Sequence, residues 1–368
     1  MRQLSGKRKI AFVIHNLGSG GAERVVTLLA NHLVQSYHVT IITHKKRQPF
    51  YELHKEICFF HCFNDTLRSQ NALESIRNNW RLYKRVNTLI RENRIELCIG
   101  FMTTSNVLSV LASRSNGIPV VISERNNPEE EKNKLSHLWR FLKKYTYRKA
   151  DKLVVQNNRI KSLYINDIDN KKLQIIPNPI NPGLRPDPNV EMSNIILNVG
   201  RLERQKAQDT LIKAFANLNP SGWELHIIGD GRQRSYLEAL IDQLHMNDKV
   251  RLLGKKKNIQ PYYAKARIFV LSSLYEGFPN VLLEAMQMGK ACISTDCPTG
   301  PSDIISHGDD GILVPVGNTA ELEAALRDLI ENPAKERQLG EKAKDATRPY
   351  QIENIAAVWE ELIAELLK

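Results

Sequence analysis

The sequence contains no apolar run near the roughly 18 residues that a membrane-spanning helix requires. Its five cysteines form no CxxC pair and no zinc-binding spacing, which suits a reducing compartment. The basic residues from Lys7 to Lys9 are followed only by the short apolar run 10–14, less than a signal peptide needs. These absences predict a cytoplasmic protein without a transmembrane helix or a disulfide framework.

Acidic residues are scarce in the first half of the chain. Residues 1–183 carry a net charge of +16 and the remainder −4, which together make the overall +12. Between Leu135 and Lys152, aromatic side chains alternate with Lys and Arg, and residues 71–94 add more basic side chains. This pattern is typical of a helix on an anionic membrane surface, and no base-reading motif favours nucleic acid. A solvated basic face that serves solubility is the alternative.

The order of apolar runs indicates two domains, as does the length of 368 residues. Strands are expected at 10–14, 39–43, 97–101, 120–123 and 153–155, and again at 195–199, 224–228, 250–253, 268–271, 291–295 and 312–314. Helices are expected between them, at 22–34, 71–94, 105–115 and 135–149 in the first half. The proline-rich stretch "PNPINPGLRPDP" at 177–188 separates the two sets. This pattern predicts two doubly wound α/β domains, which bind ligands at the carboxyl ends of their strands.

A glycine-rich turn, "GSGGAE", joins the first strand to the first helix. The backbone amides from Gly18 to Gly21, with the positive end of the helix, are suited to a phosphate. The turn is neither a P-loop nor GxGxxG, because Glu23 occupies the third glycine position. Lys45 to Arg47 still leave room for the 2′-phosphate of NADP. A tight turn that needs glycine flexibility is the structural alternative.

Two cations follow the first strand of the second half, in "NVGRLERQKAQD". Arg201 and Lys206 precede a helix expected near Asp209, and two cations beside a helix N-terminus suit a diphosphate. The turn from Gly229 to Gly231 follows the next strand and allows a close approach of the backbone to a ligand.

Two carboxylates stand eight residues apart in "LYEGFPNVLLEAM". Glu276 lies in a loop and Glu284 lies inside a helix expected from Asn280. The amides of Phe278, Asn280 and Val281 are expected to point from that helix N-terminus toward a ligand. Because carboxylates bind sugar hydroxyls through charge-assisted hydrogen bonds, the arrangement suits a sugar diphosphate. An exposed loop glutamate and a helix-start glutamate without a ligand are the alternative.

Together these elements resemble the retaining glycosyltransferases of family 4, which have the GT-B fold of two facing Rossmann-like domains. The resemblance spans nearly the whole chain and rests on the glycine turn, "GRLERQK", "GDG" and "EGFPNVLLEAM". It implies an acceptor-side domain over residues 1–180, completed by a last helix at 349–368. It also implies a nucleotide-sugar-binding domain over residues 181–348.

The resemblance implies roles for the donor-site residues. Arg201 and Lys206 would bind the donor diphosphate and stabilise charge on the leaving nucleoside diphosphate. Glu276 would contact the donor sugar, which makes it a catalytic candidate with the two cations, and Glu284 would bind the ribose hydroxyls. The backbone of residues 257–259, ending at Ile259, would hold the base.

The resemblance also implies the substrates. Family donors are usually UDP-sugars, and the sequence looks most like bacterial enzymes that add a hexose or N-acetylhexosamine to surface polysaccharides or lipid-linked oligosaccharides. With the basic first half, this favours a peripheral enzyme on the inner face of the cytoplasmic membrane and a polyprenyl-diphosphate-linked acceptor. Gly20 and Gly21 would lie near the donor phosphate or the acceptor, and His15 at a strand end would face the acceptor.

One position departs from the family pattern. Several relatives carry a histidine in the loop after the strand at 120–123, whereas this sequence reads "SERNNPEE" with Arg125 there. Arg125 suits a phosphate contact but is a poor proton acceptor. It is therefore assigned to the acceptor side as a binding residue.

Three other functions compete with glycosyl transfer. A glycosidase would use Glu276 and Glu284 as acid and base, but hydrolysis gives no reason for the two cations. A UDP-sugar epimerase of the same fold and a non-catalytic sugar-nucleotide-binding protein remain alternatives. No cofactor or metal is expected, because the DxD letters from Asp167 to Asp169 fall in a polar turn.

Overall fold

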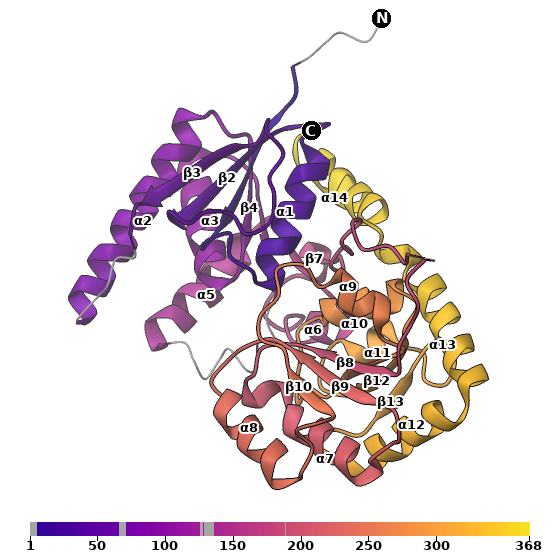
Figure 1. Ribbon diagram of the computed structural model, residues 1–368. Helices are drawn as coiled ribbons and strands as arrows, with labels where there is room; N and C mark the ends of the chain where they lie inside the picture. The colour runs from indigo at the N-terminus through magenta and orange to yellow at the C-terminus, as the bar shows by residue number, and fades with distance from the viewer. Residues whose placement is uncertain (1–5, 66–70, 126–127, 129–135, 188) are drawn as a thin grey trace, which may run out of the picture. The chain divides into compact units, whose positions relative to one another are not determined.

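The computed structural model describes residues 6–65, 71–125, 128, 136–187 and 189–368, and the chain divides into two compact units (Figure 1). Unit 1 contains residues 1–179 and 352–368, and unit 2 contains residues 180–351. Relative to the expected domains, Ile180 and residues 349–351 belong to unit 2. Leu135 and Pro188, which the sequence placed in a helix and in the linker, lie outside the described residues.

Unit 1 is built on a seven-stranded parallel sheet in the order β3-β2-β1-β4-β5-β6-β7. Its strands are β1 (Lys9–Ile14), β2 (His38–Lys45), β3 (Cys58–Phe63), β4 (Leu97–Phe101), β5 (Val120–Ser123), β6 (Lys152–Val155) and β7 (Leu173–Ile175). Its helices are α1 (Gly21–Leu33), α2 (Ala72–Glu92), α3 (Thr103–Asn116), α5 (His137–Lys149), α6 (Asn158–Ser162), the short η1 (Asn170–Lys172) and α14 (Ile352–Leu366).

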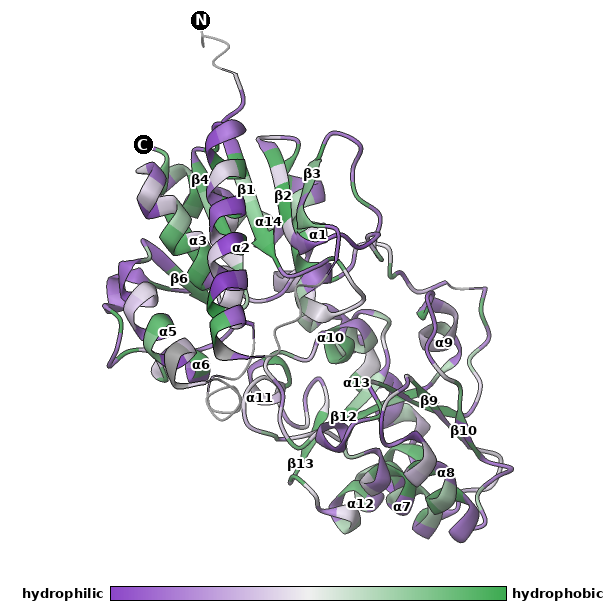
Figure 2. Cartoon of the chain, turned by 90° about the vertical axis from the view of Figure 1, so that its left-hand side faces the viewer, coloured by the Kyte–Doolittle hydropathy of each residue, from purple (hydrophilic) through white to green (hydrophobic). Residues whose placement is uncertain are grey.

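Apolar residues from both faces of this sheet are buried under helices, which is why its central strands read as continuous hydrophobic runs. Helices α1 and α14 cover one face, where the fully buried Trp359 stacks on Phe101 with their ring centroids 6.1 Å apart. Helices α2, α3 and α5 cover the other face. Figure 2 shows the hydrophobic strands between more polar helices.

Unit 2 repeats the architecture with a six-stranded parallel sheet in the order β10-β9-β8-β11-β12-β13. Its strands are β8 (Ile195–Val199), β9 (Glu224–Ile228), β10 (Val250–Leu252), β11 (Ile268–Leu271), β12 (Ala291–Thr295) and β13 (Ile312–Val314). Its helices are η2 (Arg204–Lys206), α7 (Gln208–Leu218), α8 (Arg234–Gln243), α9 (Gln260–Lys265), α10 (Asn280–Gln287), α11 (Pro301–Ile304), α12 (Thr319–Glu331), α13 (Pro333–Ala346) and η3 (Arg348–Tyr350).

The strand order reverses next to β8, the first strand of unit 2, so the loops after β8 and β11 diverge to opposite sides. Helices α7, α8 and α12 pack on one face of the sheet, and α9 and α10 pack on the other. The switch point of unit 2 therefore lies where Arg201, Lys206 and Glu276 leave their strands.

Candidate active site

Lys206 and Glu276 meet in unit 2, although they come from different loops. Lys206 Nζ lies 2.5 Å from Glu276 Oε1, and their side chains are only 15% and 8% exposed. The Ser273 hydroxyl donates to the same oxygen over 2.6 Å. The structure thus brings together two of the three predicted catalytic residues and adds Ser273, which the sequence analysis did not identify.

The loop that carries the two cations is fixed by backbone contacts. Ser272 donates to the Lys206 carbonyl over 2.8 Å, and Gln208 donates to the Arg201 carbonyl over 3.1 Å. Arg201 itself is exposed, just beyond β8. Arg201 therefore remains accessible to an anionic ligand while its backbone is held in place.

The glycines of the "GDG" turn let it pack closely against the loop that carries Arg201. A Cβ on Gly229 would lie 1.8 Å from the carbonyl oxygen of Gly200, and Gly229 has φ +149°. A Cβ on Gly231 would lie 2.3 Å from the Leu202 carbonyl oxygen. The close approach that the sequence predicted is therefore to the neighbouring loop of the protein itself.

The Glu276 loop is held from both sides. The Glu276 amide donates to the Pro298 carbonyl over 3.3 Å, and the Thr299 hydroxyl donates to the Glu276 carbonyl. Gln205 donates to the Tyr275 carbonyl over 2.8 Å, which ties this loop to η2. These contacts keep the Glu276 carboxylate next to Lys206.

Glu284 is buried in α10, where the Tyr263 hydroxyl contacts its Oε2 atom over 3.0 Å. Tyr263 belongs to α9, which begins after Ile259, and the Ile259 carbonyl accepts from the amides of Tyr262 and Tyr263. The predicted base-binding and ribose-binding segments are therefore connected through Tyr263. No local motif predicts this contact.

The helix N-terminus after Glu276 differs from the expectation in one respect. The Asn280 amide donates to the Phe278 carbonyl over 3.0 Å and so does not point outward. Pro279, the N-cap residue, has φ −81° and ψ 85°, a conformation that turns the Asn280 amide back to the Phe278 carbonyl. Phe278 is buried, and the Val281 carbonyl accepts from Tyr263 over 3.2 Å.

In the glycine turn of unit 1, side chains of the protein itself bond or cover the backbone that was expected to face a phosphate. The Gly18 amide donates to the Asn16 side chain over 2.8 Å, so the expectation that it faces a phosphate is wrong. Gly20 is the N-cap of α1, and a Cβ on it would lie 2.2 Å from Glu23 Oε2. The Glu23 carboxylate therefore covers Gly20 in the first turn, beside Gly21, and its burial raises its pKa.

His15 ends a chain of hydrogen-bonding groups at the carboxyl ends of β1 and β2. Its Nδ1 lies 3.3 Å from His44 Nδ1, and His44 Nε2 lies 3.1 Å from the Ser105 hydroxyl. Burial lowers the pKa of His44 to about 3 and also lowers that of His15, so both rings are neutral at neutral pH. His44 and Ser105 thereby orient the His15 ring, a link that sequence spacing did not reveal.

Glu124 and Lys143 form a buried ion pair beneath α5. Lys143 Nζ lies 2.9 Å from Glu124 Oε2, and the Tyr147 hydroxyl donates to the same oxygen over 2.8 Å. Lys143 is only 14% exposed, so it cannot serve the membrane surface for which the basic stretch was proposed. Lys144 and Arg148 both pair with Asp167 and lower its pKa.

Both acidic residues of the DxD letters, Asp167 and Asp169, are engaged by neighbouring groups of the protein. Asp167 is engaged by α5, and Asp169 accepts from the Lys171 amide at the start of η1. Across the described ranges, no three His, Cys, Asp or Glu side chains gather as a metal site would require. Likewise, no helix among these residues has the length and hydrophobicity of a membrane span.

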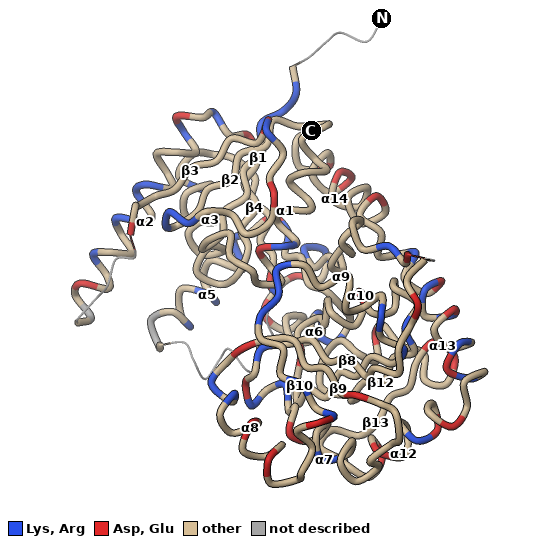
Figure 3. Tube along the Cα trace, in the orientation of Figure 1, with Lys and Arg blue, Asp and Glu red and all other residues tan. Residues whose placement is uncertain are grey.

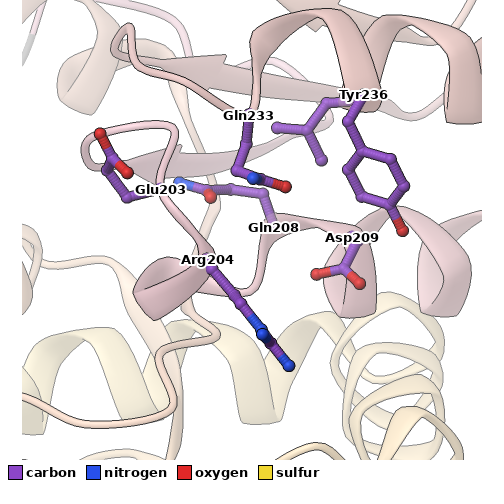
Figure 4. Close-up of a pocket in the computed structure, with 7 residues that line it drawn as sticks. Glu203, Arg204, Gln208, Asp209, Gln233 and Tyr236 are labelled. Carbon is purple, nitrogen blue, oxygen red and sulfur yellow. The ribbon is translucent and has the colours of Figure 1, made fainter.

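A polar pocket of about 280 Å³ lies in unit 2, beside the loop that follows β8 and between η2 and the first turns of α7 and α8. In Figure 4 the side chains of Gln208 and Gln233 lie together, and Tyr236 lies above Asp209. The lining residues are Glu203, Arg204, Gln208, Asp209, Gln233, Tyr236 and Leu237. The pocket adjoins the Arg201 loop through Gln208, but the predicted donor residues do not line it.

Comparisons with known proteins agree with this geometry. The family Glycosyl transferases group 1 matches residues 184–346, and Glycosyltransferase Family 4 matches residues 19–184. The chain is 30% identical, over 97% of its length and 99% of the relative's, to a Campylobacter jejuni protein. That relative is named GalNAc-alpha-(1->4)-GalNAc-alpha-(1->3)-diNAcBac-PP-undecaprenol alpha-1,4-N-acetyl-D-galactosaminyltransferase. The chain belongs to glycosyltransferase family 4.

Two further similarities extend over nearly the whole glycosyltransferase. A second Campylobacter jejuni protein, N-acetylgalactosamine-N,N'-diacetylbacillosaminyl-diphospho-undecaprenol 4-alpha-N-acetylgalactosaminyltransferase, is 31% identical over 95% of this chain and 97% of its own. The crystal structure of Anabaena HepE in complex with UDP covers 97% of this chain and 100% of its own, with a TM-score of 0.82 and 20% identity. The expected GT-B fold is confirmed, and the protein is a hexosyltransferase-type enzyme of bacterial surface glycan synthesis.

Proposed function

We propose that this glycosyltransferase moves a hexose or N-acetylhexosamine, with retention, from a UDP-sugar to a polyprenyl-diphosphate-linked saccharide. The buried Lys206–Glu276 pair, with the exposed Arg201 on the same loop as Lys206, carries the proposal. The named acceptors of the Campylobacter relatives are undecaprenol-linked saccharides, and HepE binds UDP. His15 and Arg125 are assigned to the acceptor side, and Gly20 and Gly21 to the donor phosphate or the acceptor.

Binding of the donor would give both members of this ion pair new partners. Both contacts to the Glu276 carboxylate, from Lys206 and from Ser273, go to Oε1. A donor diphosphate gives Lys206 a second anion, while Glu276 accepts hydrogen bonds from the donor sugar. The positive charges of Arg201 and Lys206 then face charge that grows on the departing diphosphate.

The acceptor step needs no strong enzyme base. A nucleotide sugar has a good leaving group, so the enzyme must bring the acceptor hydroxyl to the anomeric carbon and stabilise the leaving diphosphate. In front-face attack the leaving phosphate takes the acceptor's proton as the new glycosidic bond forms. Because Arg201 and Lys206 supply the positive charge, we propose that transfer is independent of a metal ion.

A transfer assay tests this function. The protein is incubated with radiolabelled UDP-glucose, UDP-galactose, UDP-GlcNAc or UDP-GalNAc and with polyprenyl-diphosphate-linked saccharides. Label in the lipid-extractable product, with retained anomeric configuration by NMR, supports the proposal. An epimerase would instead convert the free UDP-sugar, and a non-catalytic binding protein would bind UDP in calorimetry without forming either product.

We also propose that the enzyme attaches peripherally to the cytoplasmic face of the membrane, mainly through α2. Leu73, Ile76 and Trp80 are 79%, 53% and 55% exposed, and their spacing places them on one face of the helix. The basic residues of α2 accompany this apolar stripe (Figure 3). Exposed apolar and cationic side chains on one helix suit the headgroup region of an anionic bilayer.

Phe141 and Tyr145 of α5 add a second exposed aromatic pair, whereas Tyr147 of the same helix is packed in the core. Among the described residues, Arg77 and Arg81 of α2 form no ion pair, unlike Lys144 and Arg148 of α5. The cationic side chains of α2 are therefore the better candidates for lipid contact.

Vesicle co-sedimentation tests the membrane proposal. Changing Ile76 and Trp80 to Ser should release the protein from vesicles containing anionic lipid, and changing Arg77 and Arg81 to Glu should do the same. Each basic residue near such a surface contributes about 1 kcal/mol. Transfer to a short water-soluble acceptor should be retained. Wild-type protein that stays in the supernatant at low salt would contradict the proposal.

A further inference from the structure

The carboxyl ends of β5 and β6 hold a cluster of buried polar atoms that includes Arg125, which is assigned above to the acceptor side. Ser123 pairs with Val154 in the parallel register of these strands. Two residues further along, Arg125 and Gln156 follow the same alternation, so both face the side of the sheet that α1 and α14 cover. Both residues are buried.

Among the described residues, no carboxylate forms an ion pair with the Arg125 guanidinium. Its Nη1 donates to the Asn178 side-chain oxygen over 2.5 Å, and its guanidinium lies 5.1 Å from the centre of the Phe101 ring. Its Nε and Nη2 atoms have no hydrogen-bond partner in the described structure, nor does either carboxamide atom of Gln156. Buried polar atoms are nearly always hydrogen-bonded, so this cluster requires an explanation.

Glu124, the adjacent carboxylate, forms no ion pair with the Arg125 guanidinium, although its charge acts on Arg125 and its Oε1 atom accepts from the Arg125 amide over 3.3 Å. Alternation along the strand directs its side chain to the opposite face of the sheet, where Lys143 and Tyr147 bind it. Burial lowers the pKa of Arg125 to about 9, and the charge of Glu124 opposes this shift only in part. The guanidinium is thus a buried cation whose direct contacts among the described residues are the Asn178 amide and the Phe101 ring.

We infer that Arg125, with Gln156 beside it, binds an anionic oxygen group of a substrate, either a phosphate or a carboxylate. The Nε and Nη2 atoms carry the parallel pair of N–H bonds with which arginine holds such a group in a bidentate manner. The Gln156 amide supplies an additional neutral donor. This inference rests on the proposed glycosyl transfer and assigns unit 1 an anion site of its own.

Two sources supply this chemistry in the proposed reaction. The anion belongs either to the donor diphosphate or to the acceptor, as its lipid diphosphate or an acidic sugar. Because both sources offer the same anionic chemistry, two measurements are needed to distinguish them: the affinity for UDP and the KM for the acceptor.

The test compares Arg125→Met with Arg267→Met in the full-length protein. Arg267 is a matched control, because its guanidinium pairs with Glu336 over 2.6 Å. Removing an unpaired buried cation should leave the melting temperature of the free enzyme unchanged or raise it, while removing a paired one should lower it. For transfer activity, Arg125→Met should be the more damaging variant. Its kcat/KM should fall about 10- to 100-fold, whereas that of Arg267→Met should stay within about twofold of the wild-type value.

Pyrophosphate provides a readout that does not depend on activity. At constant ionic strength it should raise the melting temperature of Arg267→Met more than that of Arg125→Met. A weaker UDP affinity of Arg125→Met in calorimetry assigns the anion to the donor, and an unchanged UDP affinity with a raised acceptor KM assigns it to the acceptor.

The opposite result overturns the inference. If Arg125→Met melts at a lower temperature, responds to pyrophosphate like the control and transfers normally, Arg125 is structural and ordered water satisfies its N–H groups. A wild-type protein that forms no product with any donor refutes the proposed function instead, and the pyrophosphate comparison still decides the anion site.

Discussion

Replacing Lys206 and Glu276 separately and together should separate their contribution to stability from their contribution to catalysis. The pair is short, at 2.5 Å, and mostly buried. Removing one partner leaves the other as a buried charge, which typically costs about 3–5 kcal/mol of folding free energy. In Lys206→Met, Glu276 keeps its hydrogen bond from Ser273, so we expect a loss near the lower end, about 3 kcal/mol.

The double variant Lys206→Met, Glu276→Gln should recover most of that loss. It contains no buried charge at this position, and the glutamine oxygen can still accept from Ser273. Catalysis should not recover, because each variant lacks a group that acts on the donor. One missing electrostatic contact of this kind costs roughly 2.7–4 kcal/mol, which is about 10²–10³ in kcat.

Urea unfolding followed by far-UV circular dichroism gives the stabilities, and the transfer assay gives kcat. Lys213→Met is the control, because Lys213 lies 3.8 Å from Asp209 in an exposed pair on α7. It should change the free energy of unfolding by no more than about 0.5 kcal/mol. A double variant as unstable as Lys206→Met would refute the electrostatic account, and one with full transfer activity would refute the site.

Four shorter predictions follow from other features. EDTA should leave most transfer activity in place; activity lost on chelation and restored by manganese would show that the diphosphate is neutralised differently. In calorimetry, Glu284→Gln should weaken UDP binding, whereas Glu276→Gln should mainly reduce turnover; equal losses in UDP affinity would mean that the two roles are not separable. Gly229→Ala should destabilise unit 2 by at least about 1–3 kcal/mol, because its Cβ would lie 1.8 Å from the Gly200 carbonyl oxygen; a normal urea midpoint would contradict this close approach. His44 has its pKa lowered from 6.5 to about 3, so the unfolded state binds its proton first and stability falls as the pH drops through this range. His44→Asn should therefore unfold less steeply with acid between pH 6.5 and 3, and an unchanged acid profile would argue against a buried neutral ring.

The sequence predicted the central strands of both sheets because these are buried on both faces and read as continuous apolar runs, and it also predicted the edge strands β10 and β13 of unit 2. It missed β3 and β7, which lie at the two edges of the unit 1 sheet. Several residues of β3 are only half-buried, and β7 is a three-residue strand that follows Lys171 and Lys172. Edge strands with partial exposure lack the hydrophobic contrast that identifies central ones.

The candidate site was predictable where a motif carried it. Lys206 and Glu276 are 70 residues apart in the chain, yet both belong to recognisable motifs. The contacts of His44 with His15 and Ser105 depend on which strands pair, so no local spacing reveals them. By contrast, the capture of the Gly18 amide by Asn16 is a short-range Asx contact that the sequence could have suggested.

Helix α14 gives the chain an unusual order of assembly during synthesis. Trp359 and its neighbours complete the core of unit 1, but they leave the ribosome only after all of unit 2 has been made. Unit 2 is one continuous segment and can close its own core while unit 1 still waits for the side chains that cover Phe101. A fragment that ends at Pro179 would expose that apolar face to solvent, so the two halves of this enzyme cannot be separated by a single cut.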